Sequence, residues 1–380
     1  MFTFPGAVID LNRIFTDAHY GLRPVGGCVR DQLLGIKPKD YDLCTDATPD
    51  EMMSLARKAG VPVVPTGLQH GTVSFIIDHV AYEVTTLRID TSCDGRHAEV
   101  AFTRDWRQDA ERRDLTMNAM MVDFEGNLYD WYGGREDIDA RRVRFVGSPN
   151  ARITEDYLRI LRFIGSPGKF PRAGTAVTLD SEGLEAVARH AGGLANISVE
   201  RIWTEVRRIL ACHRAPELAR IMNETGVSAV IGLPAHNPEL AERTAANGGS
   251  AIAFLAASVR DEKEAADLAE RWKMSSDDRS YLTFLAGNRN ASSLTVLEDA
   301  LADNVQRDRV VDLAKLTGLD VRHIEGFPMP LFPVRGSDLL ELGMTSGPIF
   351  GKTLKKLRQD WMASRFTLTR EALLSSLPSN

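Results

Sequence analysis

The chain has 380 residues, a formal net charge of −6 and 43% hydrophobic residues, which is ordinary for a soluble protein with two or more cores. No apolar run approaches the ~20 residues needed to cross a bilayer, and the first residues lack the pattern of a secretory signal. The cysteines, Cys28, Cys44, Cys93 and Cys212, form no CxxC pair, which argues against a zinc site and for reduced thiols. We therefore expect a cytoplasmic protein.

The first informative segment is the glycine pair Gly26-Gly27, which opens a short amphipathic stretch. Glycine lets backbone N–H groups approach a phosphate closely, and the start of a helix is its electropositive end. Arg30 follows and can hold a phosphate through its charged fork. We expect these three residues to bind a triphosphate.

Two aspartates, Asp40 and Asp42, follow after a turn at 35–39 in a strand-like run. Side chains two residues apart on a strand point to the same face, so both carboxylates should project together. Converging carboxylates suit a hard cation such as Mg²⁺, and Mn²⁺ accepts the same oxygen ligands. Each motif alone also fits an ordinary turn. Together they predict nucleotidyl transfer, with both aspartates as catalytic metal ligands.

The next helix is predicted to follow Thr48, which suits the N-cap, with Pro49 at the first helical position and Glu51 at the third. Alternating runs then predict strands at 72–77, 81–88 and 119–124. Glu83, within the second run, is the candidate for a third catalytic carboxylate. A cross-strand salt bridge is the alternative role for this side chain.

Residues 20–165 carry an ordered series of motifs, among them Gly26-Gly27-x-Val29-Arg30-Asp31, Asp40-x-Asp42-Leu43, Thr66-Gly67-x-x-His70-Gly71, Arg112-Arg113-Asp114-Leu115 and Glu155-Asp156-x-x-Arg159-x-x-Arg162. The series resembles the class II tRNA nucleotidyltransferases, or CCA-adding enzymes, and the bacterial poly(A) polymerases. The segment at 66–73 is similar to the CCA-adding type.

The resemblance implies template-independent addition and repair of the 3′-terminal CCA of tRNA from CTP and ATP, with release of pyrophosphate. Two Mg²⁺ ions, or Mn²⁺, would lower the pKa of the RNA 3′-hydroxyl and neutralise the leaving group. The expected partners are a tRNA 3′ end, CTP and ATP, without DNA or a membrane, for a monomer or a homodimer. Alternatives are CC-only addition, poly(A) synthesis and a weakly catalytic RNA-binding relative. The polar segment at 90–97 resembles the family's mobile loop for switching from CTP to ATP, which favours full CCA addition.

Further nucleotide contacts are expected from Arg113, Asp114 and Asn118. Arg113 can hold a phosphate, and Asp114 and Asn118 suit ribose or loop contacts. The alternative is a local ion-pair cluster of Arg112, Arg113 and Asp114.

A helix is predicted to start at Thr154 and to bind the nucleotide. The spacing of Glu155, Arg159 and Arg162, by four and three residues, puts them on one face of this helix, and Asp156 lies beside that face. One interpretation is an intrahelical Glu–Arg pair worth a few tenths of a kcal/mol. The other is a protein template, in which Asp156 accepts from the amino group of C or A and Arg159 donates to the ring nitrogen. Uracil and guanine carry a carbonyl oxygen at the position of that amino group, and the carboxylate of Asp156 would repel it.

Gly165 stands where the family that this chain resembles has another arginine. Glycine, with Pro167 after it, should end or distort the helix. We expect a missing phosphate or base contact, and weaker nucleotide binding than in a relative that has the arginine.

The predicted fold class is α+β, a small mixed-sheet head followed by an elongated all-α region. The expected parts are a catalytic head at 1–150, a nucleotide-selecting neck at 151–220, a body at 221–290 and a tRNA-binding tail at 291–380.

The negative net charge does not exclude RNA, because one basic face is enough for binding. The predicted RNA contacts in the tail are Lys352, Lys355, Lys356 and Arg358. Trp361 and Phe366 are expected in the core of the tail.

Overall fold

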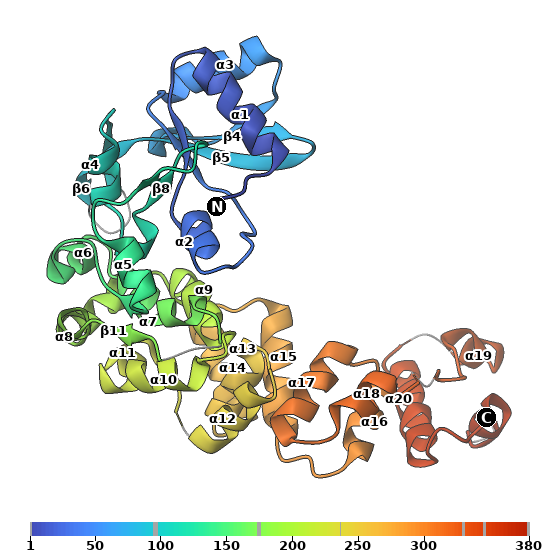
Figure 1. Ribbon diagram of the computed structural model, residues 1–380. Coiled ribbons are helices and arrows are strands. Elements are labelled where there is room, and N and C mark those ends of the chain that lie inside the picture. The colour runs from blue at the N-terminus through green and yellow to red at the C-terminus, as the bar shows by residue number, and fades with distance from the viewer. Residues whose placement is uncertain are drawn as a thin grey trace. The chain divides into compact units, whose positions relative to one another are not determined.

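The computed structural model describes residues 2–93, 98–172, 176–235, 237–328, 331–344 and 347–377. The chain folds as two compact units, Met1–Leu233 and Pro234–Asn380 (Figure 1). The division into head, neck, body and tail is finer than these two units and remains a prediction.

The first unit contains a five-stranded mixed sheet in the order β1-β2-β5-β4-β3. Its strands are β1 (Leu22–Pro24), β2 (Leu43–Thr45), β3 (Val63–Gly67), β4 (Thr72–Ile77) and β5 (Val80–Thr86). β2 runs parallel to β5, and the other neighbours are antiparallel. The strand predicted at 72–77 is confirmed, and β5 covers most of the run at 81–88.

Three smaller strand pairs complete the β structure of the described residues. They are β6 (Arg88–Cys93) with β7 (Ala98–Phe102), β8 (Met121–Val122) with β9 (Leu128–Tyr129), and β10 (Arg142–Val143) with β11 (Thr178–Leu179). The run at 119–124 thus forms only a two-residue strand. In the segment at 90–97, which resembles the family's mobile loop, residues 90–93 belong to β6, which pairs with β7, and residues 94–97 lie outside the described residues.

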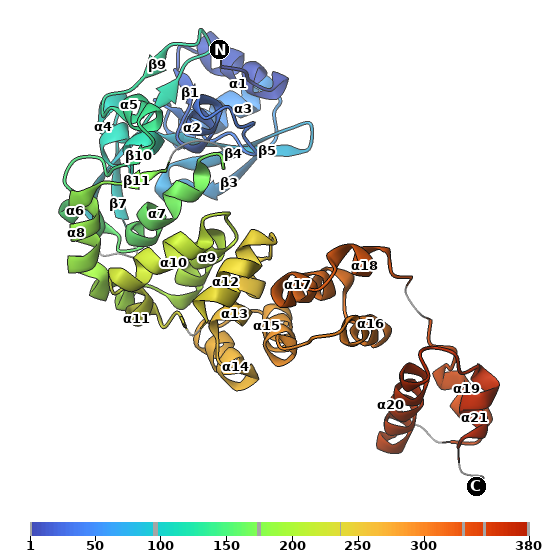
Figure 2. The same ribbon diagram turned by 60° about the horizontal axis from the view of Figure 1, so that its bottom comes forward.

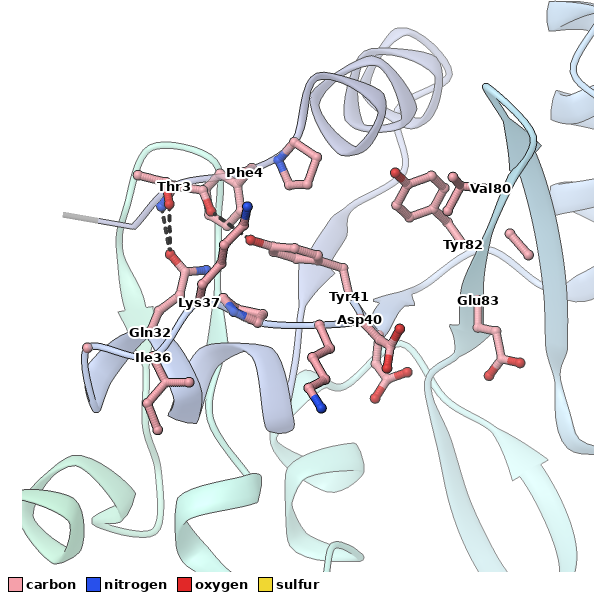
Figure 3. Close-up of a pocket in the computed structure, with 16 residues that line it drawn as sticks. Thr3, Phe4, Gln32, Ile36, Lys37, Asp40, Tyr41, Val80, Tyr82 and Glu83 are labelled. Carbon is pink, nitrogen blue, oxygen red and sulfur yellow. Dashed lines mark hydrogen bonds between the residues drawn. The ribbon is translucent and has the colours of Figure 1, made fainter. Parts of the chain in front are cut away.

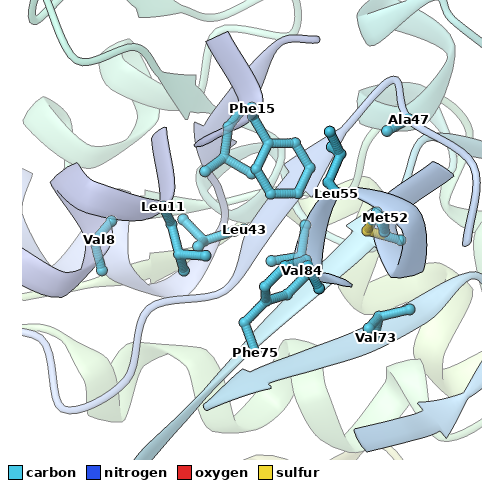
Figure 4. Close-up of a cluster of buried hydrophobic side chains, with 12 residues drawn as sticks. Val8, Leu11, Phe15, Leu43, Ala47, Met52, Leu55, Val73, Phe75 and Val84 are labelled. Carbon is cyan, nitrogen blue, oxygen red and sulfur yellow. The ribbon is translucent and has the colours of Figure 1, made fainter. Parts of the chain in front are cut away.

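The main core of this unit lies between the sheet and two helices, α1 (Gly6–Asp17) and α3 (Pro49–Ala59) (Figure 4). Phe15 of α1 meets Phe75 of β4 with ring centroids 5.6 Å apart. The predicted start of α3 is confirmed, because Thr48 and Glu51 form a reciprocal capping box with Pro49 in the first turn.

Along the chain, the remaining helices of the first unit lie between strands or follow β11. They are α2 (Gly27–Leu33), α4 (Trp106–Glu111), α5 (Gly134–Asp139), α6 (Pro149–Glu155), α7 (Arg159–Gly165), α8 (Ser181–His190), α9 (Val199–Leu210), α10 (Ala215–Glu224) and α11 (Val227–Ile231).

Two helices occupy the region where a single helix was predicted to start at Thr154. α6 ends at Glu155, and Asp156 adopts an extended backbone with φ −151° before α7 begins. Thr154 lies in the last turn of α6, where its hydroxyl donates to the carbonyl of Asn150 at 2.9 Å. The prediction of Thr154 as an N-cap was wrong, because the preceding Ser148-Pro149 step already starts a helix.

The predicted helix end at Gly165 is confirmed. α7 stops at this residue, and a 3₁₀ turn, Ser166–Lys169, follows it.

Among its described residues, the regular elements of the second unit are all helices (Figure 2). Its helices are α12 (Pro238–Ala246), α13 (Ala251–Ser258), α14 (Glu262–Arg271), α15 (Ser276–Asn288), α16 (Leu294–Ala302), α17 (Arg307–Thr317), α18 (Val321–Gly326), α19 (Gly336–Glu341), α20 (Pro348–Ala363) and α21 (Arg370–Ser375). Trp361 is buried and lies 5.0 Å from Phe366 between ring centroids, which confirms their core role. The mixed sheet followed by helices confirms the α+β class.

Candidate active site

A cavity of about 940 Å³ opens in the first unit beside β5 and the segment that precedes β2 (Figure 3). We call it the carboxylate cavity, because the exposed acids Asp40, Asp42 and Glu83 line it. Figure 3 shows the carboxylates of Asp40 and Glu83 toward the same end of this cavity. All three predicted catalytic acids therefore line the same cavity.

The parallel pairing of β2 with β5 explains why Asp42 and Glu83 are neighbours. Leu43 pairs with Val84 in this register, and each acid directly precedes one of these partners. Leu43 and Val84 are buried in the core. Because consecutive side chains alternate between faces, Asp42 and Glu83 share the opposite face.

Asp40 and Asp42 were predicted within a strand, but β2 begins only at Leu43. The two acids lie in the irregular segment before it. The backbone carbonyl of Asp42 accepts a hydrogen bond from the Val25 N–H at 3.0 Å. This bond holds the segment against the residues that lead into Gly26.

As a pair, the carboxylates of Asp40 and Asp42 suit a divalent cation. The side chain of Asp42 is exposed toward the cavity, but partial desolvation by the surrounding protein raises its pKa, an effect that Arg113 opposes and the negative charge of Asp40 reinforces. Two carboxylates that repel each other on a cavity wall provide the hard oxygen ligands that Mg²⁺ prefers. Within the described ranges, no group of three His, Cys, Asp or Glu side chains is close enough to hold a metal. Glu83 therefore does not complete a closed ligand set with the aspartates in this structure.

A second cavity of about 310 Å³ has mostly basic walls, and we call it the arginine cavity. It is lined by Gly26, Gly27, Arg30, Asp42, Arg112, Arg113, Asp114, Asn118, Arg159 and Arg162. Most of the predicted nucleotide-binding residues meet here, although Glu155 and Asp156 do not line it. Asp42 lies on the walls of both cavities.

Gly26 has a structural reason to be glycine. Its φ is +72°, a left-handed conformation that side chains rarely adopt, and a Cβ would lie 3.4 Å from Arg113 Nη1. The glycine thus lets the guanidinium of Arg113 lie against the backbone at the cavity wall.

A buried carboxylate that the sequence analysis missed holds the arginine pair. Asp109, in the middle of α4, accepts from Arg112 Nε at 2.8 Å and from Arg113 Nη2 at 2.9 Å. Burial works to raise the pKa of Asp109, but Arg113 and Arg112 hold it below its usual value. An ion-pair cluster of Arg112, Arg113 and Asp114 was the predicted alternative, but in the structure Asp109 is the carboxylate that pairs with both arginines. The spacing of three and four residues along a helix was the signal that could have identified it.

Arg30 and Asn118 connect distant parts of the chain across the arginine cavity. Arg30 Nη1 donates to Asn118 Oδ1 at 2.8 Å, and Asn118 Nδ2 donates to Asp114 Oδ1 at 3.1 Å. Arg30 also donates to Asp31 at 2.7 Å through Nη2. These bonds hold the guanidinium of Arg30 in place before any ligand binds.

The side chains of Asp156 and Arg159, the proposed base-reading pair, have different partners in this structure. Asp156 Oδ2 accepts from Arg201 Nη2 of α9 at 2.9 Å, whereas Arg159 Nη1 donates to Glu155 Oε2 at 2.6 Å. Arg159 also donates through Nη2 to the backbone carbonyl of Arg112 at 3.1 Å. The Glu–Arg pair of the first interpretation is present, and it spans the break between α6 and α7.

Arg162 is exposed and lies between two acids, 3.7 Å from Asp114 and 3.9 Å from Glu205. Three residues further on, Gly165 packs closely against α9, and a Cβ there would lie 2.8 Å from Ile209 Cγ1. Any side chain at position 165 would require the side chain of Ile209, or α9 itself, to shift.

The predicted tail contacts differ from one another. Lys352, Lys355 and Lys356 are exposed on α20. Arg358 instead donates to the carbonyl of Ala302 at 2.9 Å, so it has a role inside the second unit.

Comparison with known families supports a common origin over nearly the whole chain. The family described as the poly A polymerase head domain matches residues 22–144, and the family described as a probable RNA and SrmB-binding site of polymerase A matches 177–240. The chain is 38% identical to CCA tRNA nucleotidyltransferase 1, mitochondrial, of Danio rerio, across 98% of this chain and 91% of the relative. It is 37% identical to the CCA-adding enzyme of Geobacillus thermodenitrificans over 63% of this chain and 57% of that enzyme.

Solved structures show the same architecture. The Bacillus stearothermophilus CCA-adding enzyme in complex with CTP matches with a TM-score of 0.70 and 26% identity, over 94% of this chain and 92% of that one. The Thermotoga maritima CCA-adding enzyme complexed with tRNA_CCA has a TM-score of 0.63 at 19% identity, over 99% and 97% of the two chains, which supports the fold alone. In the described part of the chain, no helix is long and apolar enough to cross a bilayer.

Proposed function

The chain belongs to the family of CCA-adding tRNA nucleotidyltransferases, and from this premise we propose that it builds and repairs the 3′-terminal CCA of tRNA. The substrates are a tRNA 3′ end, CTP and ATP, and each addition releases pyrophosphate. The position of Asp42 on the walls of both cavities is the observation that carries the proposal.

The two cavities suit the two reactants. In nucleotidyl transfer, the attacking hydroxyl and the leaving pyrophosphate lie on opposite sides of the α-phosphorus. We assign the RNA 3′ end to the carboxylate cavity and the triphosphate to the arginine cavity. Asp42 then lies where the hydroxyl meets the α-phosphate.

Asp40 and Asp42 would hold the divalent cations, Mg²⁺ or Mn²⁺, and Glu83 is proposed as a third catalytic carboxylate on the wall of the same cavity. When bound, these ions would lower the pKa of the 3′-hydroxyl and neutralise charge on the phosphates. Arg30 and Arg113 bind phosphate oxygens, and their bonds to Asn118 and Asp109 orient them beforehand. Asp114 and Asn118 contact the ribose or the adjoining loop.

Base selection is assigned to Asp156 and Arg159. Arg159 lies on the wall of the arginine cavity, and Arg201 orients the carboxylate of Asp156. Glu155 positions Arg159 through their ion pair. A carboxylate that accepts from an exocyclic amino group favours C and A over U and G, by roughly 1–3 kcal/mol per base.

The exposed lysines of α20, Lys352, Lys355 and Lys356, are proposed as outer contacts with tRNA phosphates. Recognition of an A-form acceptor arm would depend on its shape and backbone, so affinity should fall steeply with salt. The expected cytoplasmic location and the oligomeric state, monomer or homodimer, remain predictions.

One assay tests the proposed function. The protein is incubated with Mg²⁺ and tRNA that lacks its last three nucleotides, with CTP and ATP singly and together, and the product ends are sequenced. The expected product with both nucleotides is a single CCA. A poly(A) tract, CC alone, or no extension would contradict the proposal and identify a polymerase, a CC-adding enzyme or a weakly catalytic RNA-binding protein.

A further inference from the structure

A third cavity, of about 320 Å³, lies next to the arginine cavity, and we call it the lysine cavity. It shares four wall residues with the arginine cavity, Arg30, Asp114, Asn118 and Arg162. It has no wall residue in common with the carboxylate cavity. The arginine cavity therefore lies between the other two.

The walls of the lysine cavity are predominantly basic. They carry four cations, Arg30, Arg162, Lys169 and Arg208, against the carboxylates Asp114 and Glu205. Arg30 pairs with the nearby Asp31, and Arg208 pairs with Glu205 at 2.8 Å. Lys169 differs, because within the described residues no carboxylate lies at ion-pair distance from its ammonium.

The local sequence explains how Lys169 reaches this wall. α7 ends at Gly165, and the 3₁₀ turn that follows is anchored by the buried side chains of Pro167 and Phe170. Ser166 also donates to the carbonyl of Arg162 at 2.7 Å, which ties the turn to the helix. Because its neighbours are fixed, the backbone of Lys169 is fixed too, and its exposed side chain lines the cavity.

We propose that Lys169 binds the leaving-group side of the incoming nucleoside triphosphate, at its β- or γ-phosphate. This inference rests on the proposed function, which assigns the RNA hydroxyl to the carboxylate cavity. An in-line displacement then directs the leaving pyrophosphate away from that cavity, through the arginine cavity and toward the lysine cavity.

The electrostatics of this wall agree with the assignment. The side chain of Lys169 is exposed at this wall, yet partial desolvation by the surrounding protein, followed by the positive charge of Arg30, lowers its pKa. A phosphate between these two cations would relieve their repulsion and favour the charged form of the lysine. Lys169 thereby provides a cation near Gly165, where the sequence analysis expected a missing phosphate contact.

The test compares dissociation constants measured by calorimetry for CTP, CMP and inorganic tripolyphosphate, in Mg²⁺ and without RNA. The variants are Lys169→Gln and Lys169→Arg, with Lys58→Gln on the exposed end of α3 as the matched control. We expect Lys169→Gln to weaken CTP and tripolyphosphate about tenfold and CMP less than twofold. Lys169→Arg should retain most of the affinity, and Lys58→Gln should match the wild type.

Several results would overturn the inference. Unchanged CTP affinity in Lys169→Gln would exclude the contact, and an equal loss for CMP and CTP would indicate a structural role. The same variants are also titrated with tRNA lacking CCA. A loss of tRNA affinity without a loss of tripolyphosphate affinity would assign the lysine to an RNA phosphate. Failure of the proposed function looks different, because the wild type would then bind CTP but would not add a single CCA to the tRNA.

Discussion

The carboxylate of Asp109 accepts a hydrogen bond from Arg113 Nη2 at 2.9 Å, and the side chains differ greatly in exposure, 1% for the aspartate and 20% for the arginine. The buried carboxylate of Asp109 thus holds the guanidinium of Arg113 at the wall of the arginine cavity. Asp109 is therefore expected to matter for stability and, through Arg113, for nucleotide binding.

Replacing Asp109 by Asn should remove the acid that pairs with both Arg112 and Arg113. We expect a loss of about 3 kcal/mol in the free energy of unfolding, because two guanidinium groups lose a buried partner. Urea unfolding monitored by circular dichroism measures the loss. The exposed pair of Arg135 and Asp139 provides the control, and Asp139→Asn should cost less than about 1 kcal/mol. Equal effects of the two substitutions would contradict the role of Asp109.

The same ion pair predicts a pH dependence of stability. Because the pKa of Asp109 is lower in the folded state, its contribution is fully present above the unfolded-state value of about 4. It is lost as the pH falls through the lowered folded-state pKa. The difference in unfolding free energy between wild type and Asp109→Asn should therefore be constant from pH 5 to 7 and shrink in more acidic solution. A difference that grows on acidification would exclude this account.

Asp42→Asn should separate activity from stability. Loss of a proposed metal ligand is expected to reduce the rate of CTP addition at least ~100-fold. The pKa of Asp42 is raised in the folded state, so its ionised form disfavours folding at neutral pH. The variant should then be at least as stable as the wild type at pH 7, and the two should converge as the pH falls below about 4. Single-turnover extension and thermal unfolding measure the two effects. A variant that is both inactive and less stable would assign Asp42 a structural role instead.

Gly165→Arg tests whether a cation at this position improves nucleotide binding. The new Cβ would lie 2.8 Å from Ile209 Cγ1 of α9, so we expect the single variant to lose about 1–3 kcal/mol of stability through overpacking. The double variant Gly165→Arg with Ile209→Ala makes room and should bind CTP more tightly than Ile209→Ala alone. Calorimetric titration with CTP gives both comparisons. Unchanged affinity in the double variant would contradict the predicted missing contact.

Arg201→Ala should weaken base selection. Arg201 donates to Asp156 at 2.9 Å, so its loss removes an interaction that orients the proposed base-reading carboxylate. We expect the preference for CTP over UTP to fall several-fold, within the roughly 1–3 kcal/mol available to such contacts. Competition between the two nucleotides in one extension reaction measures this ratio directly. An unchanged ratio with a slower overall rate would place Arg201 outside base selection.

The amino-acid sequence by itself determined the features that depend on local spacing. The capping box of Thr48 and Glu51, the strand at 72–77 and the end of α7 at Gly165 were all predicted. Each involves residues within one helical turn or one strand, where backbone geometry and residue type suffice. The ordered motifs between residues 20 and 165 also indicated the family. The helix predicted from Thr154 was wrong, because a nearby start signal at Ser148-Pro149 took precedence.

Tertiary structure alone decided which polar side chains lie near one another. Arg30 bonds to Asn118, Asp156 to Arg201, and the parallel register of β2 and β5 brings Asp42 beside Glu83. These partners are far apart in the chain, so no periodicity links them. Their contacts follow from how the sheet pairs and how α7 packs against α9. For the same reason, only the folded chain places Lys169 on the wall of a cavity that adjoins the candidate active site.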